Sequence, residues 1–292
     1  MPRTITVGLD GSPESRAAAE WAAREARLRG LPVKLVHAWE AIPEHLAEAS
    51  HRGAETLQHW TERIPREAAE DLRQRHPGVE VTTEQLSGPA AEALAHAATD
   101  AEILVLGSRG LGGLGGLVVG SIGFAVVART ERPVVLVRAG ERTTGEHETD
   151  TSRPVVLGLD VGRPDDALIG FAFDAAARRN VPLRVVHGWN PPPYYAYGMA
   201  LEPAVEREMA KGDAVMVTEV LRSWRQKFPD VEVVEEPRYG SPSTLLLDAS
   251  QDASLVVVGR RVRHSSLGAH IGPVTHAVLH HSAAPVAVVA HD

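Results

Sequence analysis

The sequence predicts an α/β protein made of two doubly wound domains in tandem, each built on a five-stranded parallel sheet. Short aliphatic segments alternate with longer segments rich in Ala, Glu and Arg, which is the alternation expected of strands and helices. The aliphatic segments are apolar on successive residues, as in ILVL at residues 103–106. Such runs indicate strands that helices cover on both faces. The whole pattern then occurs a second time.

The second copy begins about 150 residues after the first, where VVLGLDVGRPD at residues 155–165 repeats ITVGLDGSPES at residues 5–15. Further pairs keep an offset of 150 or 152 residues: Asp10 and Asp160, His37 and His187, Gly107 and Gly259, Gly120 and Gly272, Pro133 and Pro285. This period is too long for a solenoid repeat and indicates a duplicated domain. We predict domains at residues 1–138 and 154–292, joined by a polar linker at residues 139–153.

The elements of the first domain follow from local signals. Strands are predicted at residues 4–9, 32–38, 79–85, 102–107 and 133–138. The helix after the first strand has its own start signal, with Ser12 as N-cap, Pro13 at the first helical position and Glu14 in the first turn. The last strand of each domain, at residues 134–137 and 286–289, is apolar and would invite pairing if it were left open at an edge.

Composition and charge exclude several classes of function. The net charge of −8 and the scattered basic residues argue against a nucleic-acid-binding face. The absence of cysteine excludes disulfides, thiolate metal sites and thiol redox chemistry. No apolar segment approaches the roughly 18 residues that span a membrane, and no signal peptide precedes the first strand. We therefore expect a cytoplasmic protein without membrane contacts.

The glycine-rich segment VLGSRGLGGLGGLVVGS, residues 105–121, is the clearest candidate for a binding site. In a doubly wound sheet, ligands bind beyond the carboxyl ends of the strands where the winding order reverses. Glycine permits close approach to the backbone, and the helix that opens at Gly120-Ser121 offers unpaired N–H groups. The segment thus predicts a phosphate site, and Asp10 could accept a hydrogen bond from a ribose hydroxyl. Two plainer alternatives stay open: Asp10 caps the next helix, and the glycine segment is a flexible loop.

The spacing Gly107-x2-Gly110-x9-Gly120-Ser121, with Gly8-Leu9-Asp10, resembles the ATP-binding pattern of the universal stress protein family. The resemblance covers essentially the whole chain twice, as in tandem members of the family. It implies Rossmann-like, adenine-nucleotide-binding domains related by a pseudo-twofold axis, with antiparallel contact between their last strands. It also implies a site for ATP, with Mg²⁺ held mainly by phosphates and water. The implied binding residues of the first domain are Leu9, Asp10, Ala38, Gly107, Arg109, Gly110, Gly120, Ser121 and Ile122.

Only the first domain matches this pattern in full. The corresponding residues of the second domain are Asp160, Gly188, Gly259, Arg261 and Gly272. Val262 replaces the second glycine and Pro273 replaces the serine, and both changes weaken a phosphate cradle. The neighbouring arginines could compensate in part as charge-assisted donors. We expect the second site to bind ATP at least about tenfold more weakly, or in another pose.

The resemblance implies a nucleotide-dependent regulator or sensor of a stress response. A slow ATPase or phosphotransfer enzyme at the same site, and a protein-interaction scaffold that binds no nucleotide, remain alternatives. No P-loop is present and no lysine lies between residues 35 and 210, so the lysine-dependent template for phosphoryl transfer fails. GLGGLG at residues 110–115 satisfies G-x-G-x-x-G in letters, but it does not open a helix and lacks the acidic partner of a dinucleotide site.

The histidines and the partners are less informative. His37 and His187 occupy equivalent strand positions, each two residues before a tryptophan on the same face, and we expect packed, hydrogen-bonded imidazoles. His276 and His280 lie four residues apart on a predicted helix, but no HExxH motif accompanies them, and zinc takes three or four ligands. We therefore predict no metal ligands. We expect an intramolecular pseudo-dimer, with a homodimer and an unidentified protein partner left open.

Overall fold

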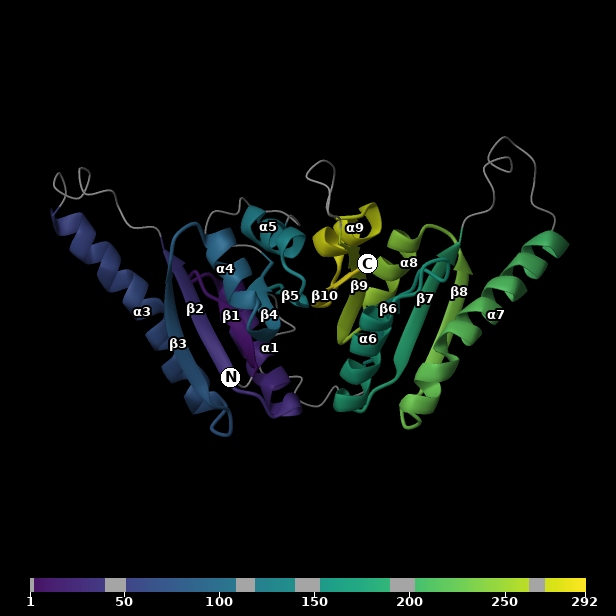
Figure 1. The fold of residues 1–292 in the computed structure, drawn as a ribbon, viewed down its shortest axis with the longest axis horizontal. Helices are drawn as coiled ribbons and strands as arrows, with labels where there is room; N and C mark the ends of the chain where they lie inside the picture. The colour runs from purple at the N-terminus through teal and green to yellow at the C-terminus, as the bar shows by residue number, and fades with distance from the viewer. Residues whose placement is uncertain (1–2, 40–50, 109–118, 140–152, 190–202, 263–270) are drawn as a thin grey trace. The chain divides into compact units, whose positions relative to one another are not determined.

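The computed structural model describes residues 3–39, 51–108, 119–139, 153–189, 203–262 and 271–292 (Figure 1). The chain divides into two compact units, Met1–His147 and Glu148–Asp292. Most of the predicted linker, residues 140–152, lies outside the described residues. In the part of the chain that the structure describes, no helix is long and apolar enough to cross a membrane.

The first unit alternates strands and helices. In chain order these are β1 (Thr4–Gly8), α1 (Pro13–Arg29), β2 (Val33–Trp39), α3 (His51–Arg75), β3 (Val81–Ser87), α4 (Ala90–Ala98), β4 (Ala101–Gly107), α5 (Ser121–Arg129) and β5 (Val134–Val137). The five strands pair in parallel in the order β3-β2-β1-β4-β5, so the winding reverses between β1 and β4. Helix α1 packs beside α3, and α4 beside α5, so two helix layers enclose the sheet. Each predicted strand is present within two residues of its expected ends.

The second unit repeats this arrangement. Its elements are β6 (Val155–Gly158), α6 (Asp166–Arg179), β7 (Leu183–Trp189), α7 (Pro203–Lys227), β8 (Val233–Tyr239), α8 (Pro242–Ser250), β9 (Leu255–Arg261), α9 (Pro273–His281) and β10 (Val286–His291). The parallel order within the unit is β10-β9-β6-β7-β8. Both units are therefore doubly wound, Rossmann-like sheets, as the sequence predicts.

The core of each unit lies on both faces of its sheet. Ile103, Leu104 and Val105 follow one another in β4, and each is 0% exposed. Successive side chains of a strand point to opposite faces, so both faces of β4 must be covered. This confirms the two-sided burial that the apolar runs predict.

Helix α1 begins as its sequence indicates. Ser12 is the N-cap, its side chain accepts a hydrogen bond from the Ser15 backbone N–H at 3.1 Å, and Pro13 follows in the first turn. The helix ends at Gly30, which has the left-handed φ of 64° that favours glycine. Ser12 thus fixes where the loop between β1 and α1 ends, and Gly30 fixes where the loop between α1 and β2 begins.

The two units hold their equivalent helix pairs together by different means. Between α6 and α7, Phe173 is fully buried, with its ring centroid 6.0 Å from that of Trp224 and 5.5 Å from that of Phe228. The equivalent residues of the first unit, 150 or 152 positions earlier, are Ala23, Leu72 and His76. The first unit therefore lacks this aromatic cluster, and polar contacts join α1 to α3.

Candidate functional site

Leu9 and Asp10 lie at the carboxyl end of β1, where the winding of the first sheet reverses. The Leu9 N–H donates to the Val36 carbonyl at 2.8 Å, and the Leu9 carbonyl lies 2.7 Å from Nδ1 of the buried His37. His37 is thus hydrogen-bonded within a packed face, as expected. Since the protein already uses both polar backbone groups of Leu9, this residue can offer a ligand its side chain and the second lone pair of its carbonyl.

The Asp10 carboxylate organises the loop that leads into α1. Its Oδ1 accepts hydrogen bonds from the Ser12 N–H at 2.9 Å and from the Ser12 hydroxyl at 2.5 Å. Asp10 therefore does not cap α1 itself but orients the serine that does. These two bonds use part of the roughly four acceptor positions of a carboxylate.

A cavity of about 410 Å³ opens beside Asp10, between α1 and α3. Leu9, Asp10 and Gly11 line one end of it. The helix walls carry apolar and charged side chains together: Ser15, Arg16, Ala19, Ile64, Glu67, Ala68, Asp71, Leu72 and Arg75. Gly11 has a φ of 84°, and a Cβ there would lie 3.4 Å from Cδ1 of Ile64, so this turn both needs glycine and approaches α3 closely.

Ion pairs close the far end of this cavity. Glu20 of α1 accepts a hydrogen bond from His76 Nε2 at 2.7 Å and forms an ion pair with Arg75, which also pairs with Asp71. Burial alone would lower the pKa of Arg75. The hydrogen bond with Asp71 and the charges of Glu20 and Asp71 outweigh this effect and raise the pKa above its ordinary value, so the guanidinium stays charged.

Gly107 ends β4 beside this loop, because the β1–β4 register pairs Gly8 with Leu106. A Cβ at Gly107 would lie 2.8 Å from the Glu14 carbonyl carbon and 2.9 Å from the Ser15 nitrogen. Any side chain would therefore collide with the backbone of α1. Glycine is required here for close packing of helix on strand, whether or not a ligand is bound.

A backbone hydrogen bond joins the two ends of the segment that connects β4 to α5. The Ser108 carbonyl accepts a hydrogen bond from the Gly120 N–H at 2.9 Å, and the Ser108 N–H donates to Val137 at 2.7 Å. Ser108 is 3% exposed, and among the described residues its hydroxyl oxygen has no hydrogen-bond partner. Arg109 and Gly110 lie outside the described residues.

Helix α5 starts at the predicted position, directly after Gly120. In the described part of the chain no side chain caps it, so the first-turn N–H groups of Ser121 and Ile122 are placed to meet an anion. The Gly120 backbone is extended, with φ −68° and ψ 152°, which any residue can adopt. The backbone conformation at this position therefore does not require glycine.

In the second unit, side chains of the protein occupy the space beside Gly259, the counterpart of Gly107. A Cβ at Gly259 would lie 2.6 Å from Nε2 of His291, and the Thr275 hydroxyl donates to the Gly259 carbonyl at 2.7 Å. Gly272 is the N-cap of α9, and Pro273 in the first turn removes one N–H group. Asp160 is exposed, and its carboxylate accepts a hydrogen bond from the Gly162 N–H at 3.1 Å.

The remaining predicted residues lie on strands. Ala38 is half-buried in β2, whereas a Cβ at its counterpart Gly188 would lie 2.8 Å from Cα of Pro242, so packing against α8 requires that glycine. Arg261 is the last residue of β9 and pairs in register with His291. Arg260 beside it is 4% exposed.

The model of the Universal stress protein family matches the chain twice, over residues 1–138 and 151–290. The chain belongs to the universal stress protein family. This confirms the resemblance drawn from the glycine spacing.

Curated relatives of the family span the whole chain. A universal stress protein of Mycolicibacterium smegmatis (strain ATCC 700084 / mc(2)155) is 33% identical and covers 98% of this chain and 96% of its own length. Universal stress protein Rv1996 of Mycobacterium tuberculosis (strain ATCC 25618 / H37Rv) is 31% identical and covers 97% of this chain and 94% of its own length. The crystal structure of a universal stress protein from Archaeoglobus fulgidus DSM 4304 has a TM-score of 0.68 at 16% identity, covering 99% and 98%, and shows the same fold.

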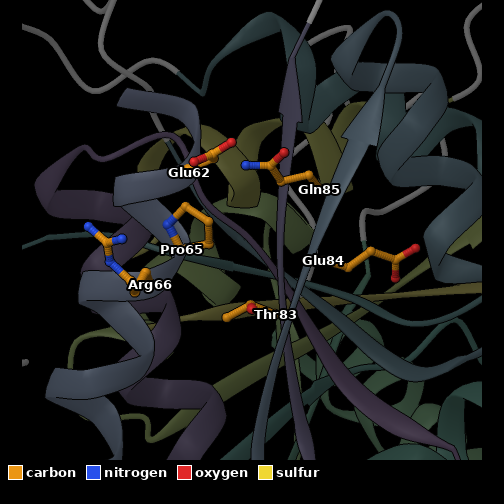
Figure 2. Close-up of a pocket in the computed structure, with 6 residues that line it drawn as sticks. All are labelled: Glu62, Pro65, Arg66, Thr83, Glu84 and Gln85. Atoms are coloured by element: carbon orange, nitrogen blue, oxygen red, sulfur yellow. The ribbon is translucent and has the colours of Figure 1, made fainter. Parts of the chain in front are cut away.

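In this universal stress protein a second cavity, of about 280 Å³, lies between α3 and β3 (Figure 2). Its lining residues are Glu62, Pro65, Arg66, Thr83, Glu84 and Gln85. Figure 2 shows the side chains of Arg66 and Glu84 extending to opposite sides, and Glu84 forms an ion pair with Lys34. No residue predicted to bind nucleotide lines it, so the cavity beside Asp10 is the better candidate.

Sequence reasoning did not find the part of the site that α3 supplies. Ile64, Ala68 and Leu72 recur at a spacing that predicts only an apolar helix face. Which neighbour this face meets depends on tertiary packing, so no local signal assigns it to the cavity. Among the described residues, no group of three or more His, Asp or Glu side chains could hold a metal ion.

Proposed function

We propose that the first unit binds ATP with Mg²⁺ and that the protein acts as a nucleotide-dependent regulator or sensor of a stress response. The observation that carries this proposal is the uncapped N-terminus of α5, which follows β4 where the winding of the sheet reverses; the neighbouring strand β1 leads into Leu9 and Asp10. Unpaired N–H groups and the positive helix dipole favour phosphate at such a position. Membership of the family supports the same conclusion.

Each part of the nucleotide has a proposed contact. Asp10 accepts from the ribose hydroxyls, and Leu9 and Ala38 border the base. The phosphates and ribose lie along the glycine segment: Gly107, Arg109, Gly110, Gly120, Ser121 and Ile122. Mg²⁺ is held mainly by phosphate oxygens and water, which is a usual arrangement for this ion. The pairing of the last strands and the cytoplasmic location stay predictions, and a homodimer stays an open alternative.

Asp10→Asn tests the ribose contact. A hydrogen bond to a charged group contributes about 1.5 to 3 kcal/mol, so we expect a roughly 10- to 100-fold rise in the Kd for Mg·ATP, measured by calorimetry. Ser12→Ala is the control, because it removes the cap and the hydroxyl bond to Asp10 but keeps the Asp10 carboxylate and its bond from the backbone N–H of residue 12. The control should cost about 0.5 to 2 kcal/mol of stability and leave the Kd nearly unchanged. An unaltered Kd in Asp10→Asn would refute the assignment.

The two units should differ in affinity. In the second unit Pro273 removes a phosphate-directed N–H, and Thr275 and His291 occupy the space beside Gly259. Titration of the full chain should therefore resolve one strong ATP site and a second that is at least about tenfold weaker. Asp10→Asn should weaken the strong site, whereas Asp160→Asn should leave it unchanged. Two equal sites would contradict this expectation.

Hydrolysis distinguishes a regulator from an ATPase at the same site. The described residues that line the cavity beside Asp10 include no lysine, and two of its carboxylates, Glu67 and Asp71, are paired with Arg63 and Arg75. Turnover above about 1 per second, the lower end for ordinary enzymes, would favour the enzymatic alternative. Nucleotide released from the purified protein on denaturation, identified by mass spectrometry, would exclude the empty scaffold.

A further inference from the structure

Helix α9 carries two histidines one turn apart on one face. His276 is exposed and His280 is half-buried, and their ring centroids lie 4.5 Å apart with the planes inclined at 46°. Residues at i and i+4 project from the same side of a helix, which explains why the rings meet. The nucleotide site proposed above makes no use of this pair, since it involves the N-terminal end of α9.

Two adjacent imidazoles suit a transition metal ion. Imidazole nitrogen is a favoured ligand of Zn²⁺, Cu²⁺ and Ni²⁺. Each ring has two nitrogens, so one can bind the metal while the other keeps a hydrogen bond within the protein. The helix ends at His281, and the negative end of its dipole favours a cation in the last turn.

The sequence alone predicts no metal ligand here, because it offers no complete zinc site of three or four ligands. With the two rings brought together, we propose that His276 and His280 form a two-histidine chelate for a divalent transition metal ion, with water completing the coordination. His281 is not a member: residues at i and i+1 do not face each other on a helix, and its ring centroid lies 6.1 Å from that of His280. The described residues supply no third ligand, which agrees with the absence of any larger cluster among them. The site is therefore exchangeable, unlike a structural zinc site with four protein ligands.

The first unit provides an internal comparison. The residues of α5 equivalent to His276 and His280, 152 positions earlier, are Phe124 and Ala128. Neither is a metal ligand, so the chelate belongs to the second unit alone. The unit whose phosphate cradle is weakened by Pro273 thus has a separate site for a different class of ligand. This inference does not depend on nucleotide binding.

The test uses the full chain without an affinity tag, titrated with Cu²⁺, Ni²⁺ and Zn²⁺ in a buffer that does not chelate metals. The variants His276→Phe and His280→Ala introduce the residues found in α5. Each should lower the affinity at least about tenfold, since even loss of an outer-shell partner costs 10- to 100-fold at metal sites. Affinity should follow the order Cu²⁺ above Ni²⁺ and Zn²⁺ and fall on acidification, because protons compete for the imidazoles.

Controls separate this site from the other histidines of the chain. His281→Ala, on the same helix, should bind metal as the wild type does. Electron paramagnetic resonance of the Cu²⁺ complex should show two coordinated nitrogens, and one or none in either variant. Circular dichroism checks that the variants remain folded. Affinity unchanged in both His276→Phe and His280→Ala, or lost equally in His281→Ala, would overturn the proposal.

Discussion

Replacing Phe173 with Ala should lower the free energy of unfolding by about 3 to 5 kcal/mol, the range for a buried aromatic residue. Phe173 is 0% exposed, and its ring contacts those of Trp224 and Phe228 on the neighbouring helix region. Truncation removes these ring contacts, which add about 0.5 to 1.5 kcal/mol each beyond area burial. It also leaves a cavity that the helices α6 and α7 can close only in part.

Urea denaturation of the full chain measures this loss, and hydrogen exchange shows where it occurs. Amides of α6 and α7 should lose protection first, since Phe173 joins these helices. Phe173→Leu keeps most of the volume and should cost less than about 1.5 kcal/mol. Val215→Ala, at a position 69% exposed on α7, should change stability by no more than about 0.5 kcal/mol. A loss from Phe173→Ala no larger than that of Val215→Ala would show that the aromatic cluster does not support the fold.

The sequence predicts the fold well because its signals are local. The apolar runs of β4 and β9 identify strands without knowledge of their neighbours, since two-sided burial leaves no alternation to misread. Ser12 and Pro13 likewise mark the start of α1 within the chain itself. The parallel orientation of the strands then follows from the helices between them, because parallel strands need crossover connections.

The site is less predictable because it depends on contacts between distant segments. The spacing of glycines identifies Gly107, but its collision with Glu14 and Ser15 appears only when α1 is placed on β4. The spacing also identifies Gly120, but the structure shows an extended backbone there that does not require glycine. The cavity beside Asp10 depends on how α3 packs against α1. The ion pair between Arg75 of α3 and Glu20 of α1 joins residues 55 positions apart. No pattern along the chain indicates such a pairing.

Gly107→Val should destabilise the first unit by at least about 3 kcal/mol, the upper end for overpacking, and should also abolish tight ATP binding. The added Cβ would lie within 2.9 Å of three atoms of Glu14 and Ser15, two of which belong to the backbone of α1. A backbone cannot rotate away as a side chain can, so α1 must shift from β4. That shift moves Ser12 and Asp10, so the proposed ribose contact would be lost with the packing.

The control for this prediction is the N-cap glycine of the second unit. Among the described residues no atom lies within 4 Å of a Cβ built at Gly272, and its φ of −68° is allowed to valine. Gly272→Val should therefore cost less than about 1 kcal/mol, the scale of an N-cap change. Urea unfolding and calorimetric titration with Mg·ATP on both variants compare the two sites directly. If Gly107→Val is as stable as Gly272→Val, α1 does not pack on β4 as closely as the structure indicates, and the link between packing and the ribose contact fails with it.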